Sequence, residues 1–192
     1  MFLTVRFEDA LLYATRLHAR QLRKGSGVPY VAHLLGVASL ALEHGANEDE
    51  AIAALLHDAV EDQGGAPRLE EIRARFGERV AEIVSGCTDA DVIPKPPWRE
   101  RKERYIAHLS EADASVRLVS AADKLHNARS ILSDYRTQGE TLWPRFKGGR
   151  DGTLWYYRAV VEAFRAFGST PLTNELARVV DELERLTEKG QK

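Results

Sequence analysis

Apolar residues recur along almost the whole chain at the spacing of an α-helix, and this periodicity most constrains the fold. Near the end of the chain, for example, they stand at positions 172, 176, 179, 180, 183 and 186. Side chains three or four positions apart lie on one face of a helix, so such a stretch buries one side of an amphipathic helix. We find no convincing run of the alternation typical of a half-buried strand. The sequence therefore predicts an all-α fold.

Glycine and proline divide this pattern into separate helices. Residues 25–29 form a turn rich in helix breakers, residues 88–97 contain three prolines, and residues 137–152 contain four glycines and one proline. Because proline and glycine disfavour continuous helix, we expect loops there, the last one irregular and mobile. Asn47 and Glu50 resemble a capping box that opens a helix. The expected helices span residues 7–22, 30–43, 47–61, 69–76, 78–87, 98–109, 115–132, 153–167 and 171–189.

Length and charge limit the class of protein. We expect the 192 residues, 44% of them apolar, to form a single domain over 1–192, with a core over about 7–167 and a C-terminal helix over about 171–189. The apolar stripe of that last helix either packs on the core or forms a homodimer contact. A net charge of −2 argues against binding a nucleic-acid polymer, so an anionic ligand needs a local cationic cluster. Without a signal peptide or a membrane-spanning run, we expect a cytoplasmic protein.

The segment HDAVED, residues 57–62, places four ionisable side chains after the apolar stretch 52–56. Burying such groups is unfavourable unless something balances their charge. If the helix stays regular, His57 lies over Glu61 and Asp58 over Asp62, because positions four apart are neighbours. Imidazole beside carboxylates is a suitable ligand set for Mn²⁺, Fe²⁺ or Zn²⁺. The alternative is a frayed, solvated helix end.

A second polar stripe is expected on the helix over 115–132. Asp123, His126, Asn127 and Ser130 stand at i, i+3, i+4 and i+7, which places them along one helix face. The preceding turns of that face are apolar, so Asp123 needs a cation or a hydrogen-bond donor if it is buried.

His33 completes a recognisable pattern. It stands among apolar neighbours in the helix expected over 30–43, and alone it fits either a metal ligand or a hydrogen-bonded core histidine. Together with His57, Asp58 and Asp123, it resembles the H…HD…D signature of HD-domain metal-dependent phosphohydrolases. The expected architecture is then an HD-domain helical bundle.

The local sequence is most similar to the hydrolase domain of RelA/SpoT homologues and to the small alarmone hydrolases, including the metazoan SpoT homologues. The resemblance covers about residues 7–167 and rests on QLRK at 21–24, PYVAH at 29–33, AALLHDAVED at 53–62, FG at 76–77 and DKLHN at 123–127. It implies an enzyme that removes the 3′-diphosphate of ppGpp or pppGpp, releasing pyrophosphate and GDP or GTP. It also implies one Mn²⁺ ion as cofactor, with Fe²⁺ or Zn²⁺ as alternatives.

The resemblance also assigns roles by position. The implied metal ligands are His33, His57, Asp58 and Asp123. The implied catalytic carboxylates, which orient or deprotonate the attacking water, are Glu61 and Asp62. The implied substrate contacts are Arg23, Lys24, Asn127, Ser130 and Tyr157, or Tyr156 if the alignment slips by one residue.

One segment leaves the substrate open. Residues 143–152 have no counterpart in the better known family members, and Lys147 and Arg150 there are either phosphate ligands or ordinary surface charges. Another nucleotide phosphate, such as the 2′-phosphate of NADPH, is therefore an alternative substrate. A non-catalytic HD module that binds nucleotide or metal is the alternative from a different class.

Overall fold

The computed structural model describes residues 2–88 and 96–190, and its regular structure over these ranges is helical. The prediction of an all-α fold is confirmed. An isolated antiparallel bridge between Leu22 and Pro29 is the sheet-like feature of the described residues. The helices are α1 (Val5–Leu17), α2 (Val31–Glu43), α3 (Glu48–Leu56), α4 (Ala59–Gln63), α5 (Ala66–Phe76), α6 (Glu78–Cys87), α7 (Trp98–Leu109), α8 (Ala114–Gln138), the 3₁₀-helix η1 (Gly139–Arg145), α9 (Gly149–Arg165) and α10 (Pro171–Lys189).

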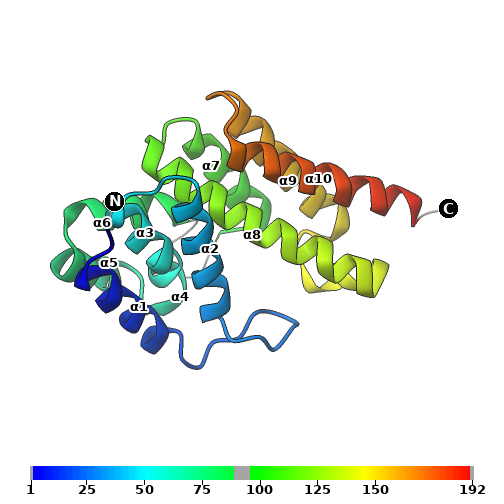
Figure 1. Ribbon diagram of the computed structural model, residues 1–192. Helices are drawn as coiled ribbons and strands as arrows, with labels where there is room; N and C mark the ends of the chain where they lie inside the picture. Colours follow the sequence, from blue (N-terminus) through cyan, green and yellow to red (C-terminus); the bar gives the residue numbers. More distant parts are fainter. Residues whose placement is uncertain (1, 89–95, 191–192) are drawn as a thin grey trace.

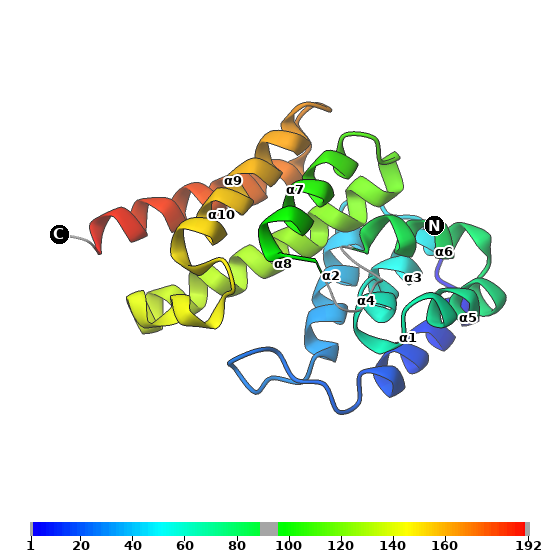
Figure 2. The ribbon, with the colours of Figure 1, turned by 180° about the vertical axis from the view of Figure 1, so that it is seen from behind.

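The long helix α8 organises the bundle. It packs against α2, α3 and α6 at one end of the molecule and against α9, α10 and η1 at the other. Figures 1 and 2 show α8 running between these two groups of helices. A residue on the inner face of α8 can therefore meet side chains from both groups.

The helix expected over 47–61 is broken, and the expectation of one regular helix was wrong. The capping box of Asn47 and Glu50 opens α3 as predicted. However, α3 ends at Leu56 and α4 begins at Ala59. His57 turns its Nδ1 atom onto the carbonyl of Ala54, at 2.9 Å. The break places the polar pair 57–58 between the buried apolar end of α3 and the buried first residues of α4, Ala59 and Val60.

The expected irregular loop over 137–152 was also wrong. Helix α8 continues to Gln138, η1 follows at once, and α9 begins at Gly149. Trp143 of η1 is buried, and its ring lies 5.4 Å from that of Tyr135 on α8. Apolar burial thus orders a segment whose glycine content indicates a loop.

The end of the first helix also differs from expectation, and one expected loop lies largely outside the described residues. Helix α1 ends at Leu17 instead of continuing to residue 22, because the chain turns there towards the Leu22–Pro29 bridge. The expected loop over 88–97 lies largely outside the described residues, since only Thr88 and residues 96–97 belong to the described ranges.

Removing a buried side chain from α3 should destabilise the fold. Leu55 is 0% exposed, and we expect Leu55→Ala to lower the free energy of unfolding by about 2–5 kcal/mol, because the substitution leaves a cavity. Leu12 is 53% exposed on α1 and serves as the control, with an expected loss below about 0.5 kcal/mol for Leu12→Ala. Urea denaturation measures both, and equal losses would contradict this account of the core.

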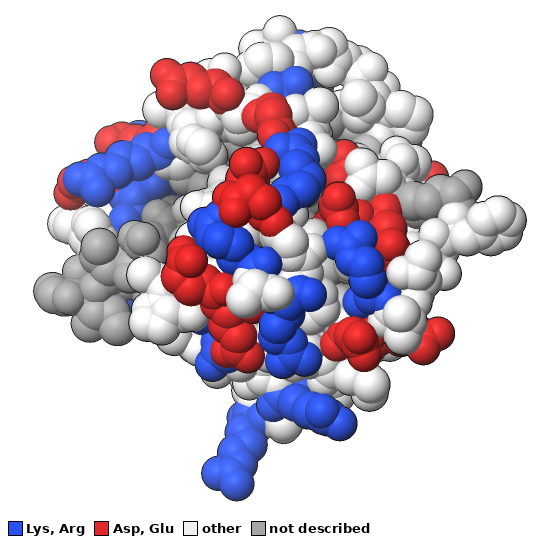
Figure 3. Space-filling model, turned by 90° about the vertical axis from the view of Figure 1, so that its left-hand side faces the viewer, with Lys and Arg blue, Asp and Glu red and all other residues white. Residues whose placement is uncertain are grey.

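The surface carries charges of both signs. On the face shown in Figure 3, Lys and Arg side chains are interspersed with Asp and Glu side chains. Among the described residues, no helix is long and apolar enough to cross a membrane.

Candidate metal centre and adjoining pocket

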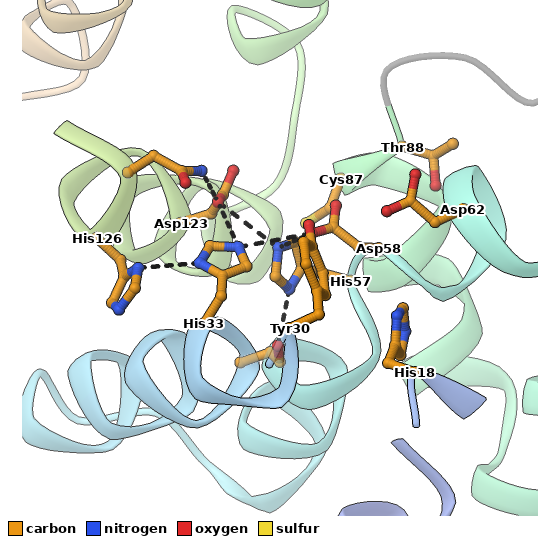
Figure 4. A network of polar contacts seen from close by, with 12 residues as sticks. His18, Tyr30, His33, His57, Asp58, Asp62, Cys87, Thr88, Asp123 and His126 are labelled. Atoms are coloured by element: carbon orange, nitrogen blue, oxygen red, sulfur yellow. Dashed lines mark hydrogen bonds and ion pairs between the residues drawn. The ribbon is translucent and has the colours of Figure 1, made fainter. Parts of the chain in front are cut away.

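Three separate parts of the fold bring histidines and aspartates together. His33 comes from α2, His57 and Asp58 from the break between α3 and α4, and Asp123 from α8. Figure 4 shows the four side chains turned towards one another. Asp58 Oδ2 lies 3.0 Å from His57 Nε2 and 3.5 Å from His33 Nε2.

Asp123 meets the same two imidazole nitrogens from the opposite helix. Its Oδ1 atom lies 3.2 Å from His33 Nε2 and 3.6 Å from His57 Nε2. The ligand atoms of His33, His57 and Asp58 lie within 4.8 Å of one another. The structure thus brings together all four residues that the sequence indicates as ligands.

The imidazole nitrogens at this centre are suited to hold a cation. The Nε2 atoms of His33 and His57 are buried and have no hydrogen-bond partner. His57 Nδ1–H donates to the carbonyl of Ala54, so its Nε2 atom is the ring nitrogen that faces the carboxylates. A ring nitrogen facing anionic oxygen is unfavourable unless a proton or a metal cation lies between them. The donor set fits a divalent ion with imidazole and carboxylate ligands.

The pKa shifts of the clustered side chains also indicate that the site favours a cation. Burial acts to lower the pKa of His57, but the carboxylates of Asp58 and Asp123 outweigh it and hold that pKa well above its usual value. Burial acts to raise the pKa of Asp58, but His57 and His33 hold it well below its usual value. Burial likewise acts to raise the pKa of Asp123, but Lys124 and the two histidines hold it well below its usual value. The site therefore favours positive charge between the two aspartates.

Hydrogen bonds orient the carboxylates around the centre. Tyr30 Oη donates to Asp58 Oδ2 at 2.5 Å. Asn127 Nδ2 donates to Asp123 Oδ1 at 2.5 Å, and Lys124 donates to Asp123 Oδ2. These donors hold Asp58 and Asp123 with particular oxygen atoms facing the imidazoles. The sequence did not indicate Tyr30 or Lys124 for this role.

Asn127 links the metal centre to the pocket beside it. Its Oδ1 atom accepts a hydrogen bond from Arg23 Nη1 at 2.9 Å, while its Nδ2 atom donates to Asp123. The sequence indicated Asn127 as a substrate contact. The structure shows that its amide also couples a predicted substrate-binding arginine to a predicted metal ligand.

His126 lies beside the metal centre, and the sequence indicated no role for it there. Its Nδ1 atom lies 2.9 Å from His33 Nδ1. Burial, together with His33 and Arg23, lowers the pKa of His126 to about 4, so the ring is neutral and can accept the Nδ1–H of His33. Its ring fits against Gly36 of α2, where a Cβ atom would lie 2.3 Å from its Cδ2 and Nε2 atoms. His33 and His126 are separated by 93 positions, which explains why spacing alone did not reveal the contact.

Removing this partner should weaken metal binding. In His126→Phe, His33 loses the acceptor that fixes its tautomer and ring orientation, and we expect the affinity for Mn²⁺ to fall about 10- to 100-fold. Calorimetric titration of the full chain measures this loss. The control is His108→Phe, since His108 is exposed on α7 and bonds to the carbonyl of Gly86. Unchanged Mn²⁺ affinity in His126→Phe would contradict the role.

The predicted catalytic carboxylates lie on α4, directly after the break. Asp62 Oδ2 accepts a hydrogen bond from Gln21 Nε2 at 2.7 Å, and Gln21 Oε1 lies 2.7 Å from Nδ1 of the buried His18. Glu61 Oε1 lies 3.9 Å from Arg101 Nη1. Figure 4 shows Asp62 beyond Asp58, on the side away from His126. Both carboxylates therefore belong to the α4 side of the metal centre.

A pocket of about 790 Å³ opens beside His33. It is lined by the five predicted substrate contacts, Arg23, Lys24, Asn127, Ser130 and Tyr157. The alternative residue Tyr156 instead packs its ring against Trp98, 6.4 Å away. Tyr157 is therefore the aromatic residue of α9 that faces the pocket.

The unassigned segment 143–152 contributes residues to this pocket, but not the two that the sequence suggested. Arg145 and Phe146 line it, whereas Lys147 and Arg150 do not. Arg150 lies 3.7 Å from Asp151 and bonds to the carbonyl of Thr187. The alternative of phosphate ligands at Lys147 and Arg150 thus lacks support, because both side chains lie outside the pocket wall.

A helical bundle with two histidines and two aspartates meeting between its helices defines a class of metal-dependent phosphohydrolases. The sequence pattern of the HD domain matches residues 10–154, and the chain belongs to the HD-domain family. The guanosine-3′,5′-bis(diphosphate) 3′-pyrophosphohydrolase MESH1 of Xenopus tropicalis is 39% identical over 126 residues, which cover 64% of this chain and 68% of the relative.

Solved structures agree with this assignment. The structure of a metazoan orthologue of SpoT that hydrolyses ppGpp is 28% identical, with a TM-score of 0.77 over 96% of this chain and 97% of its own. A protein of Listeria monocytogenes EGD-e is 31% identical, with a TM-score of 0.70 over 82% of this chain and 99% of its own. The predicted resemblance to the metazoan SpoT homologues is confirmed.

Proposed function

We propose that this chain is a metal-dependent 3′-pyrophosphohydrolase of ppGpp and pppGpp, releasing pyrophosphate and GDP or GTP. The observation that carries the proposal is the convergence of two imidazoles and two carboxylates at one end of a cation-lined pocket. The relatives named for this reaction support it. The reaction is assigned to the whole chain as a single HD-type domain.

His33, His57, Asp58 and Asp123 are the proposed metal ligands, with Mn²⁺ as the ion. A dication in such a set supplies Lewis-acid polarisation of a phosphoryl oxygen and lowers the pKa of a neighbouring water. Fe²⁺ and Zn²⁺ suit the same nitrogen and oxygen donors.

Glu61 and Asp62 are the proposed proton acceptors. A carboxylate beside the attacking water would remove its proton as the new P–O bond forms and the bond from phosphorus to the ribose 3′ oxygen breaks. The 3′ oxygen leaves with the nucleotide and takes up a proton, and general-base assistance of this kind gives rate factors of about 10²–10⁴. Gln21 holds Asp62 in place through the hydrogen bond to Oδ2. The proposed metal ligands are thus different residues from the proposed proton acceptors.

Arg23 and Lys24 are proposed to bind the phosphates, because guanidinium and ammonium groups stabilise charge on phosphoryl oxygens. Ser130 and Tyr157 line the same pocket and are proposed to contact the nucleoside. Asn127 is hydrogen-bonded to both Arg23 and Asp123. A movement of Arg23 on binding phosphate would therefore affect the orientation of the Asp123 carboxylate.

The test is turnover of the purified full chain on a nucleotide panel. We expect pyrophosphate release from ppGpp with Mn²⁺ and none above background after chelation, with Fe²⁺ and Zn²⁺ compared in parallel. Phosphate release from NADPH in preference to ppGpp would assign the alternative substrate. Nucleotide binding without turnover of any substrate would favour a non-catalytic module.

A further inference from the structure

The pocket is longer than the metal centre requires. It follows one face of α8, where Asn127 lies near the metal end and Asp134 at the far end. Asp123 and Asp134 are eleven residues apart, which corresponds to about 16 Å along a helix axis. Arg145 of η1 lines the pocket with Asp134. The far end of the pocket is thus well separated from the bond that the metal centre would break.

Positive charge concentrates along this pocket in a chain whose net charge is −2. Of the described residues that line it, four are cationic, namely Arg23, Lys24, Arg129 and Arg145, and one carboxylate, Asp134, opposes them. A concave surface lined mainly by one sign of charge focuses its potential on ligands of the other sign. The pocket therefore favours an anionic ligand along its length.

Arg145 is held in a fixed position at the far end. Its side chain is 14% exposed, and its guanidinium forms an ion pair with Asp134 and donates to Gln138 Oε1 at 3.1 Å. It also rests on Gly25, where a Cβ atom would lie 2.3 Å from Arg145 Nε. Figures 1 and 2 show η1 beside the turn that contains Gly25. The φ of +81° at Gly25 favours glycine for the same turn.

This arrangement leaves Arg145 able to bind a ligand. A guanidinium presents five N–H donors in a planar fork, so Arg145 can keep Asp134 and Gln138 and still donate to phosphate oxygens. The neighbouring Phe146 and, on α9, Tyr157 add aromatic surface to the wall. In a nucleotide phosphorylated at both the 3′ and 5′ positions, the ribose and the extended 5′-diphosphate would bridge the space between the metal centre and this cation, and the base would lie against the pocket wall.

We propose that Arg145 forms an anion subsite for the 5′-diphosphate of the substrate, remote from the bond that is hydrolysed. The inference rests on the proposed function and refines it, because it requires a substrate with anionic groups at both ends. Arg145 is then a specificity-determining residue that distinguishes guanosine 3′,5′-bis(diphosphate) from nucleotides phosphorylated at the 3′ position alone.

The test compares kcat/KM for two substrates, ppGpp and guanosine 3′-diphosphate, which lacks the 5′ phosphates. In Arg145→Gln we expect kcat/KM for ppGpp to fall about 10- to 100-fold, the range for losing hydrogen bonds to a charged group, mainly through KM. For guanosine 3′-diphosphate we expect a change below twofold. The matched control is Arg136→Gln, because Arg136 is exposed on α8 and pairs with Glu182.

A second variant tests the subsite by changing the acidic partner of Arg145. Asp134→Asn removes the carboxylate that competes for Arg145 and retains an oxygen that can accept its hydrogen bond. We expect a lower KM for ppGpp and an unchanged KM for guanosine 3′-diphosphate. If Arg145 only supported the Gly25 turn, Arg145→Gln would lower kcat/KM equally for both substrates. That result would overturn the proposed subsite.

A binding measurement separates this inference from the proposed function. GDP carries the 5′-diphosphate without a 3′ phosphate, so the change in its calorimetric affinity on substitution of Arg145 reports on the far end without a contribution from the 3′-diphosphate. We expect Arg145→Gln to weaken GDP binding at least about tenfold. If the wild-type protein does not hydrolyse ppGpp but Arg145→Gln weakens GDP binding, the subsite is supported and the proposed reaction is wrong. If GDP binding does not change, the subsite falls whether or not ppGpp is hydrolysed.

Discussion

Replacing Asp58 by alanine is expected to lower kcat/KM for ppGpp by about 10³-fold or more, because metal polarisation of the phosphoryl group contributes several kcal/mol. Asp58 Oδ2 lies within 3.5 Å of both imidazole nitrogens, so its loss removes one of the two anionic donors. Metal content of the purified variant, measured by mass spectrometry, should fall together with pyrophosphate release.

The control for this variant is an aspartate outside the site. Asp49 lies on α3 and pairs with Arg6 at 2.8 Å, so Asp49→Ala should keep both activity and bound metal. Full activity in Asp58→Ala would be incompatible with the proposed ion centre. Loss of activity with unchanged metal content would assign Asp58 a role other than that of a ligand.

Glu61→Gln and Asp62→Asn should each lower kcat by about 10²–10⁴-fold while the protein still binds metal. The amide side chains keep the size of the carboxylates but cannot accept a proton from water. In Asp62→Asn the hydrogen bond from Gln21 can be kept by the amide oxygen, so the fold around α4 is retained. Single-turnover kinetics with saturating Mn²⁺ isolate the chemical step.

A carboxylate on the surface of α5 provides the comparison. The side chain of Glu70 is 67% exposed, and Glu70→Gln should leave kcat unchanged. If the double variant of Glu61 and Asp62 retains full kcat, another group must accept the proton. If wild-type protein also binds nucleotide without turnover, the non-catalytic module is favoured.

Helix identities were largely predictable because apolar periodicity reports directly on burial of one helix face. The stripe ending at Leu186 predicted the last helix, and α10 spans Pro171–Lys189 as expected. The break after Leu56 was not predictable in the same way, since residues 57–62 still fit helical spacing. The ordered η1 was missed because burial of Trp143 depends on its contact with Tyr135, which local sequence does not show.

The four candidate ligands were indicated by the resemblance to the H…HD…D signature, and the structure brings their side chains together. The partners of these ligands could not be predicted, because each contact joins distant parts of the chain. Tyr30 is 28 positions from Asp58, and His126 is 93 positions from His33. Arg145 was missed because local sequence does not show its contacts with Asp134, Gln138 and Gly25, which distinguish it from Lys147.

The tight fit between Gly36 and the ring of His126 restricts how this part of the protein can evolve. Any side chain larger than hydrogen at position 36 would displace the ring, and the displacement would pass to His33 through their shared contact. A homologue with alanine or serine at this position would therefore need a smaller residue opposite it, or a wider separation of α2 and α8. A larger residue at position 36 is therefore expected only together with a smaller residue at position 126 or a changed spacing of the two helices.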